Sequence, residues 1–265
     1  MGLPETYPKS VERHHLQTAD GWMDCYTFRL NAEATETKAQ ATPPVILYMD
    51  AFGIRPELAE MAQRLASSGY FVAVPNLYYR AGDYAPFDPR QVASEGPERD
   101  RFKGMIQSIN NTMVMRDTGS VLALFDGHPA ARRGPIGVVG YCMGGGFALS
   151  AAGTFPDRVA AAASFHGGSL ATDKPDSAHL LADRMRARVY VGVAEIDPSF
   201  SPEQQHRLES ALSAAGADYT IETYKGARHG FAVTGHLVYD RDSSERHWRR
   251  LVQLFDETLK SSGTS

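Results

Sequence analysis

The chain has few cysteines, no excess of basic residues and no long apolar run. It has two cysteines in 265 residues, Cys25 and Cys142, so no disulfide framework is possible and we expect a reducing compartment, the cytoplasm. No run of about 18 apolar residues occurs, and the first residues lack the charged and apolar segments of a signal peptide, so we expect neither a membrane partner nor export. A formal net charge of −4 and a pI near 6.1 argue against a nucleic-acid partner.

What the chain does have is length and a regular alternation of strand and helix patterns. A chain of 265 residues can bury about three quarters of its unfolded surface, which is enough for one large domain. Buried-type strands alternate with helical patterns, and no internal repeat is visible. We therefore predict a single domain over residues 1–265 with the α/β fold, a mostly parallel central sheet with helices on both faces. Its core spans about 45–255, after an N-terminal antiparallel hairpin and loop (1–44), with a frayed tail at 260–265.

The predicted elements follow from apolar periodicity and from glycine and proline breaks. An Asp20-Gly21 turn joins the two hairpin strands, and a polar loop follows over 31–44. A long loop with several prolines and glycines, 81–97, is expected to shape a pocket with Tyr84 and Phe87. Strands are predicted at 11–17, 22–30, 45–49, 71–75, 136–139, 159–165, 188–193 and 219–224, a loop at 225–231, and helices at 56–68, 98–126 with a break near Asn110, 144–152, 202–215 and 243–259.

The segment 136–152 has the pattern of a nucleophile elbow. The apolar run breaks at Gly140, and small residues from Gly144 onward predict a closely packed helix. Cys142 stands between these glycines, in the G-x-nucleophile-x-G pattern, with cysteine in place of the usual serine. Side chains at 140 or 144 would collide with the neighbouring strand and helix, and the helix N-terminus favours a thiolate. A buried, inert cysteine is the alternative, to be decided by residues elsewhere.

Polar residues follow several of the predicted parallel strands, where reactive groups gather in open sheets. Three of them, Cys142, Asp197 and His229, occur in the chain order nucleophile, acid, histidine, which is the order of the α/β-hydrolase triad. The histidine would take the thiol proton, and the aspartate would fix the histidine tautomer. The full set of such strand-end residues is Asp50, Arg80, Cys142, His166, Asp197 and His229.

Two members of the triad also have plainer interpretations, and His229 could be an ordinary histidine of a surface loop. Asp197 before Pro198 could be a turn or helix-cap residue, and Glu195 is a rival acid that lies closer to the strand end. A metal site is the weaker alternative, because no His-x-x-x-His or Cys-x-x-Cys spacing occurs and Cys142 with His166 and His229 lacks a fourth ligand. The remaining histidines are predicted to be surface side chains: His14, His15, His128, His179, His206, His236 and His247.

Together these motifs resemble the dienelactone hydrolase family of the α/β-hydrolase fold. The matching residues lie in family order from about 45 to 255 and are more specific together than the elbow alone. The resemblance implies hydrolysis of small lactones and esters by a Cys-Asp-His triad without metal or organic cofactor. It also implies that the amides of Ala51 and Met143 form the oxyanion hole. The matching segments are Asp50-Ala51-Phe52-Gly53, Pro75-Asn76-Leu77-Tyr78, Gly140-Tyr141-Cys142-Met143-Gly144-Gly145, Asp197 and His229-Gly230-Phe231.

Two positions depart from the family pattern. Asp50 stands where the family enzyme has a glutamate that holds the thiol uncharged until substrate arrives, and we expect Asp50 to lie near the site as a supporting or water-orienting group. Arg80 matches the first of two arginines that clamp the substrate carboxylate, but Val233 replaces the second. An isopropyl group cannot make that charge-assisted contact, so a more apolar or larger ester or lactone is equally open.

The sequence thus predicts a hydrolase of small lactones or carboxylic esters that works through a thioester. Its partner would be a small-molecule substrate, and the chain would act as a monomer or homodimer. Besides the triad and the oxyanion hole, Asp50, Arg80, Tyr84 and His166 are predicted substrate-binding or supporting residues, although His166 fits a hydrogen-bonded structural histidine better. A non-catalytic ligand-binding protein on the same scaffold and an acyltransferase are the alternatives.

Overall fold

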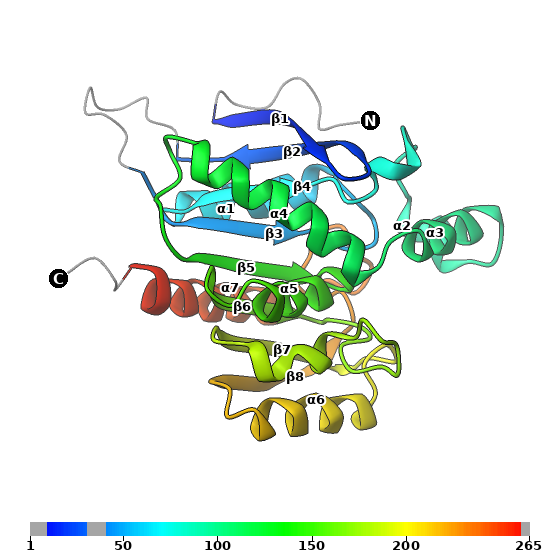
Figure 1. Cartoon of the computed structure of the whole chain (residues 1–265). Coiled ribbons are helices and arrows are strands. Elements are labelled where there is room, and N and C mark those ends of the chain that lie inside the picture. Colours follow the sequence, from blue (N-terminus) through cyan, green and yellow to red (C-terminus); the bar gives the residue numbers. More distant parts are fainter. Residues whose placement is uncertain (1–9, 31–40, 261–265) are drawn as a thin grey trace.

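The computed structural model describes residues 10–30 and 41–260, which contain a single eight-stranded sheet (Figure 1). Its strand order is β1-β2-β4-β3-β5-β6-β7-β8. The β1–β2 and β2–β4 pairs are antiparallel, and all the others are parallel. The strands are β1 Val11–Thr18, β2 Gly21–Phe28, β3 Pro44–Tyr48, β4 Phe71–Pro75, β5 Ile136–Tyr141, β6 Val159–Phe165, β7 Arg188–Ile196 and β8 Tyr219–Arg228.

Helices cover both faces of this sheet. On one face α4 packs against α5, and η2 contacts both α5 and α6. On the other, Arg64 of α1 makes a two-fold hydrogen bond with Glu245 of α7, and Figure 1 shows α7 behind the sheet from α4 and α5. The helices are α1 Pro56–Ser67, α2 Pro89–Ala93, α3 Pro97–Gln107, α4 Asn111–Gly127, α5 Met143–Thr154, α6 Pro202–Ala214 and α7 Arg241–Phe255, with 3-10 turns η1 Tyr79–Ala81 and η2 Ala178–Arg184 and a π-helical turn η3 Asp256–Lys260.

The predicted α/β architecture and the N-terminal hairpin are confirmed. The central strands β3, β4 and β5 are buried along their whole length, as continuous apolar runs predict for a parallel sheet covered on both faces. The break expected near Asn110 is also present, because its side chain accepts the Met113 amide and begins α4. Among the described residues, no helix combines the length and apolar character needed to cross a membrane. The expected loop at 31–44 lies mostly outside the described residues.

The boundaries differ from expectation mainly at the last two strands. β7 continues to Ile196 and β8 continues to Arg228, where a loop was predicted from residue 225. A register shift between Ala194 and Ile196 lets the two strands keep pairing, and the alternation that marks a strand is lost at such an irregularity. The predicted loop 81–97 also contains the short helix α2, begun by Asp88 and Pro89.

Candidate active site

The chain after each parallel strand emerges at the same edge of the sheet. Cys142 directly follows β5, His166 follows β6, and Asp197 follows β7. Asp50 lies two residues beyond β3, and His229 directly follows β8. Parallel strands with right-handed crossovers bring these distant positions together at their carboxyl ends.

Cys142 occupies a sharp turn between β5 and α5. It is the residue before α5 and has φ 57° and ψ −122°, a strained conformation for a residue with a side chain. A Cβ at Gly140 would overlap the Gly144 carbonyl, and a Cβ at Gly144 would lie 2.6 Å from the Met49 carbonyl oxygen. The two glycines are therefore required for the close strand–helix contact, as the sequence predicted.

His229 links Cys142 to Asp197. The Cys142 sulfur is hydrogen-bonded to the His229 side chain, and His229 Nδ1 lies 2.7 Å from Asp197 Oδ2. Ser199 Oγ donates to Asp197 Oδ1 at 2.5 Å and lies 3.0 Å from His229 Nδ1, while the Ser199 amide donates to the same carboxylate oxygen at 2.9 Å. Glu195, the rival acid, instead accepts the Gly226 amide at 2.7 Å.

The charges in this line of side chains favour an imidazolium. Burial by itself lowers the pKa of His229, but the Cys142 charge and the hydrogen bonds to Asp197 and Cys142 raise it to about 10. Burial raises the pKa of Asp197, whereas the hydrogen bonds from His229 and Ser199 lower it, with a net downward shift. The arrangement can therefore hold a thiolate beside a protonated histidine whose other nitrogen faces a carboxylate.

A pocket of about 280 Å³ opens at Cys142 and His229. Ala51 and Met143 line it, and the Met143 amide is at the first position of α5, where no intrahelical partner exists. The Tyr78 hydroxyl donates to the Ala51 carbonyl at 3.0 Å and lies 3.6 Å from Met143 Sδ. Tyr78 thus fixes the peptide that follows Ala51 and contacts the Met143 side chain on the other flank of the pocket.

Asp50 lies beneath this pocket in a buried charge network. Its side chain is fully buried, and both its oxygens accept hydrogen bonds of 2.6 Å from the Arg55 guanidinium. His236 Nε2 lies 3.1 Å from Asp50 Oδ2. Burial by itself raises the pKa of Asp50, but the Arg55 charge and the His236 and Arg55 hydrogen bonds hold it well below its usual range.

Three other predicted site residues lie outside the pocket lining. Arg80 is bound to Asp20 and to buried Asp117, and it is not among the residues that line the pocket at Cys142. Tyr84 packs over Gly53 and bonds to the Ile54 backbone. The structure thus places neither of these side chains, nor Phe87 of the same loop, against the space above the nucleophile.

His166 is buried beside His229 and makes no side-chain hydrogen bond to the described residues. Its ring meets the His229 ring edge-on at 5.2 Å, and neither ring nitrogen has a partner among the described residues. Burial is the main cause that lowers its pKa well below the usual value, so the ring is neutral. The expected hydrogen-bonded structural role is wrong, because the surroundings are the aromatic rings of His229, Phe231 and Tyr141.

Two of the histidines predicted to lie on the surface have internal partners. His236 bonds to Asp50, and His247 on α7 is fully buried, with Nε2 3.0 Å from the Tyr141 hydroxyl. Burial lowers the pKa of His247 to about 3, so this ring is a neutral core group. Within the basic segment 246–250, His247 and Trp248 are both buried in the core.

Nothing in the sequence indicated that several of the pocket residues have a function. Ile106, Ile109 and Asn110 come from the end of α3 and the turn before α4, where helix periodicity reveals no function. The sequence also contained no sign of a role for Arg55 or Ser199. Each nevertheless lies within five residues of a predicted site carboxylate, Asp50 or Asp197. Searching the strand-end loops for partners of those carboxylates would have found both.

One group of described residues has the spacing of a metal site, away from the pocket. Glu12 and His14 on β1 and His128 after α4 have ligand atoms within 4.8 Å of one another. However, His128 Nδ1 accepts the Ala130 amide, which places the proton of the neutral ring on Nε2, toward Glu12 at 3.3 Å. Arg29 also binds Glu12 at 2.9 Å. Hydrogen bonds and an ion pair therefore account for this group.

Comparison with known proteins points to one family. Residues 30–259 match the model of the dienelactone hydrolase family. A carboxymethylenebutenolidase of Rhodococcus opacus is 26% identical over 219 residues, 81% of each chain. A Synechocystis protein with the provisional name carboxymethylenebutenolidase is 26% identical over 221 residues, 82% of this chain and 87% of its own. A Klebsiella pneumoniae structure, provisionally named a dienelactone hydrolase, has a TM-score of 0.79 at 22% identity and covers 93% of this chain and 98% of its own.

Proposed function

Because the chain belongs to the dienelactone hydrolase family and is a hydrolase of that kind, we propose that it cleaves small lactones or carboxylic esters through a Cys142–His229–Asp197 triad. The observation that carries this proposal is the unbroken line from the Cys142 sulfur through His229 to Asp197 at the mouth of a pocket. Its members come from three different strand ends, and each makes the contact that nucleophilic catalysis needs.

In the first half-reaction the Cys142 thiolate attacks the substrate carbonyl carbon. The C=O electron pair moves to oxygen, and the Ala51 and Met143 amides stabilise the oxyanion. The intermediate then collapses, the C–O bond to the alkoxide breaks, and His229 gives that oxygen the proton it took from the thiol. A thioester on Cys142 remains, and a lactone substrate keeps its freed hydroxyl on the same acyl chain.

In the second half-reaction water resolves the thioester. Neutral His229 takes a proton from water as the oxygen attacks the carbonyl carbon, and the same two amides hold the second oxyanion. The C–S bond breaks, the carboxylic acid leaves, and Cys142 returns as a thiolate beside protonated His229. Asp197 orients His229 throughout, because its carboxylate holds Nδ1 and leaves Nε2 for the reacting groups.

The pocket lining favours a substrate without a required carboxylate. Arg80 is bound by two aspartates, and Val233, where the family has an arginine, is fully buried. Apart from Cys142 and His229, the charged side chains among the lining residues are Lys174 and Asp176, whose charges are opposite. Neutral esters and lactones therefore fit the site better than a substrate that depends on a double arginine clamp.

Turnover and trapping of the acyl-enzyme test this function. With p-nitrophenyl acetate, Cys142→Ala should lose hydrolysis and the acetyl adduct seen by intact mass, whereas Cys25→Ala should keep both. Cys25 is the matched control because it is the chain's other cysteine and is fully buried in β2. Hydrolysis retained by Cys142→Ala would contradict the assigned nucleophile.

The alternatives give different results in the same assay. A non-catalytic binding protein would show no turnover and no adduct, while still binding a lactone. An acyltransferase would form the adduct and, when an alcohol or amine is added, would release more ester or amide than acid. Product partitioning measured by chromatography therefore separates hydrolysis from transfer.

A further inference from the structure

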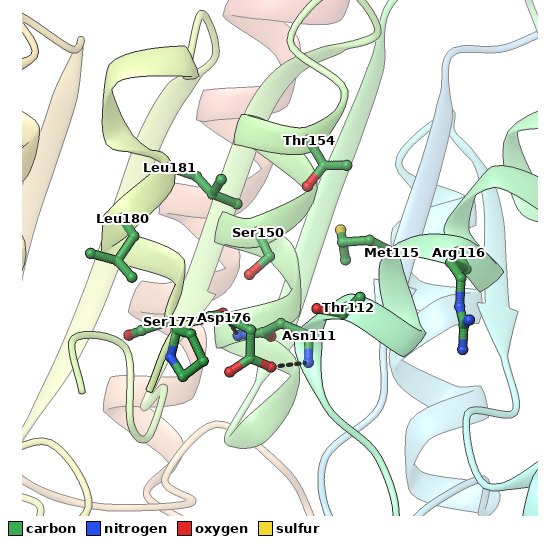
Figure 2. A pocket seen from close by; sticks show the side chains of 11 residues that line it. Asn111, Thr112, Met115, Arg116, Ser150, Thr154, Asp176, Ser177, Leu180 and Leu181 are labelled. Atoms are coloured by element: carbon green, nitrogen blue, oxygen red, sulfur yellow. Dashed lines mark hydrogen bonds between the residues drawn. The ribbon is translucent and has the colours of Figure 1, made fainter. Parts of the chain in front are cut away.

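A second cavity, of about 510 Å³, lies beside the catalytic pocket between α4, α5 and η2 (Figure 2). This volume is within the range of roughly 300–1,000 Å³ typical of small-molecule sites. Met115 of α4 and Leu180 and Leu181 of η2 contribute apolar walls. No step of the proposed reaction uses this space.

The cavity continues the catalytic pocket along one side of α5. Asn111, Asp176 and Ser177 line both spaces. On α5, Gly146 lines the catalytic pocket, and Ser150 and Thr154 line the second cavity. Residues spaced by four lie on the same helix face, so these three residues follow Cys142 along one side of α5. Ser150 lies about 12 Å along the helix axis from Cys142.

The two spaces adjoin at Asn111 and Asp176, which line both, and Gly146 of α5 lies on the catalytic side. Asn111 Nδ2 donates to the Asp176 carbonyl at 2.6 Å, and the Asn111 amide donates to the Asp176 carboxylate at 3.1 Å. A Cβ at Gly146 would point toward Asn111 Oδ1, 3.9 Å away. Gly146 itself places no side chain between α5 and Asn111.

Ser150 has a buried hydroxyl group without a hydrogen-bond partner among the described residues. It is 1% exposed and lines the cavity. Buried hydroxyls are nearly always paired, because an unpaired one costs roughly 1–3 kcal/mol. A ligand oxygen in the cavity would satisfy this donor.

We propose that this cavity binds the acyl chain of the ester substrate, a medium-length chain that is apolar along most of its length and carries an oxygen acceptor where it reaches Ser150. The inference rests on the proposed function, since the chain is attached to the carbonyl carbon that Cys142 attacks. Met115, Leu180 and Leu181 contact the methylene groups, and Ser150 donates to the oxygen. The acyl chain passes Gly146 on its way from the catalytic pocket.

Steady-state rates with p-nitrophenyl acetate, decanoate and 9-oxodecanoate test the chain site. Ser150→Met fills the cavity, so we expect kcat/KM for both ten-carbon esters to fall at least tenfold while acetate stays within twofold. Ser150→Ala should lower kcat/KM for 9-oxodecanoate about fivefold, as expected for one neutral hydrogen bond, and leave decanoate unchanged. Ser213→Met, the same change on the exposed side of α6, is the control.

Two further measurements keep the result decisive. Leu180→Trp enters the cavity from the opposite, half-exposed wall and should reproduce the loss for long chains if Ser150→Met does not fold. Equal rates for the ten-carbon esters in wild type and both filled variants would overturn the proposal. If the wild type hydrolyses no ester, the hydrolase function is rejected, and binding of decan-2-one is measured by calorimetry. Tenfold weaker binding in the filled variants would then support the chain site. Unchanged binding in those variants, or no binding to the wild type, would reject the chain site.

Discussion

Asp50 and Arg55 form a buried, two-fold hydrogen-bonded ion pair near Cys142. Both distances are 2.6 Å, the Asp50 side chain is fully buried, and that of Arg55 is 12% exposed. Arg55 is also close enough to Cys142 for their charges to interact. A cation from the segment before α1 therefore neutralises Asp50.

Removing the Asp50 charge should destabilise the protein strongly at neutral pH. In Asp50→Asn, Arg55 stays buried without its carboxylate, which typically costs about 3–5 kcal/mol. Because the folded-state pKa of Asp50 is lowered, its contribution is complete above the unfolded value of 3.8 and is lost as the pH falls toward the folded value. Urea unfolding should therefore show a large difference between variant and wild type at pH 7 and a smaller one at pH 3.

Two variants serve as comparisons for Asp50→Asn. Asp126→Asn removes a carboxylate from a more exposed pair with Arg158 and should cost less than about 1 kcal/mol. The double variant Asp50→Asn/Arg55→Gln removes both buried charges and should recover part of the loss. A neutral-pH effect of Asp50→Asn no larger than that of Asp126→Asn would contradict the buried-pair account.

The raised pKa of His229 predicts an alkaline limit to acylation. Protonated His229 supplies the proton to the leaving alkoxide, so kcat/KM for an alkyl ester should fall as the pH rises through about 10. Asp197 is one of the groups that raise this pKa, so Asp197→Asn should shift the limit to lower pH and reduce kcat/KM at least about tenfold. Glu195→Gln, which changes the rival acid, should do neither. An unshifted limit in Asp197→Asn would contradict the assigned pair.

The Tyr78 hydroxyl should act on the rate through the Ala51 peptide. Tyr78→Phe removes the hydrogen bond to the Ala51 carbonyl, so the backbone of the proposed oxyanion-hole residue is held less firmly, and we expect kcat to fall about tenfold with little change in KM. Tyr70→Phe removes a hydroxyl bound to Asp256, far from the pocket, and should leave kcat unchanged. A fall in kcat of the same size in both variants would indicate a general loss of stability instead.

The sequence could predict the fold, and it could propose the candidate triad, because both leave local signals. Buried strands are continuous apolar runs, and the elbow needs glycines at positions 140 and 144, so each can be recognised from neighbouring residues. Asp197 and His229 were identified because every parallel strand ends at the same edge of the sheet. The topology of a parallel sheet thus predicts that residues far apart in the sequence form one candidate site.

The surroundings of the site could not be predicted because they depend on long-range pairing. Arg80 looked free for substrate, but its partners Asp20 and Asp117 come from the hairpin turn and from α4. Asp50 is paired with Arg55 and with His236, which is 186 residues away in the chain. No local sequence pattern indicates which cation pairs with which carboxylate. These ion pairs could therefore be assigned only from the three-dimensional structure.

The ion pairs of Arg80 with Asp20 and Asp117 imply a structural role. Arg80→Gln should lower the free energy of unfolding by about 3 kcal/mol, because Asp117 would stay buried without its cation. The ratio of kcat/KM for a carboxylate-bearing ester to that for its neutral methyl ester should not change. Lys174→Gln alters a charge that does line the pocket, so it should lower that ratio. A lower ratio in Arg80→Gln with stability unchanged would show instead that Arg80 leaves its aspartates and binds substrate.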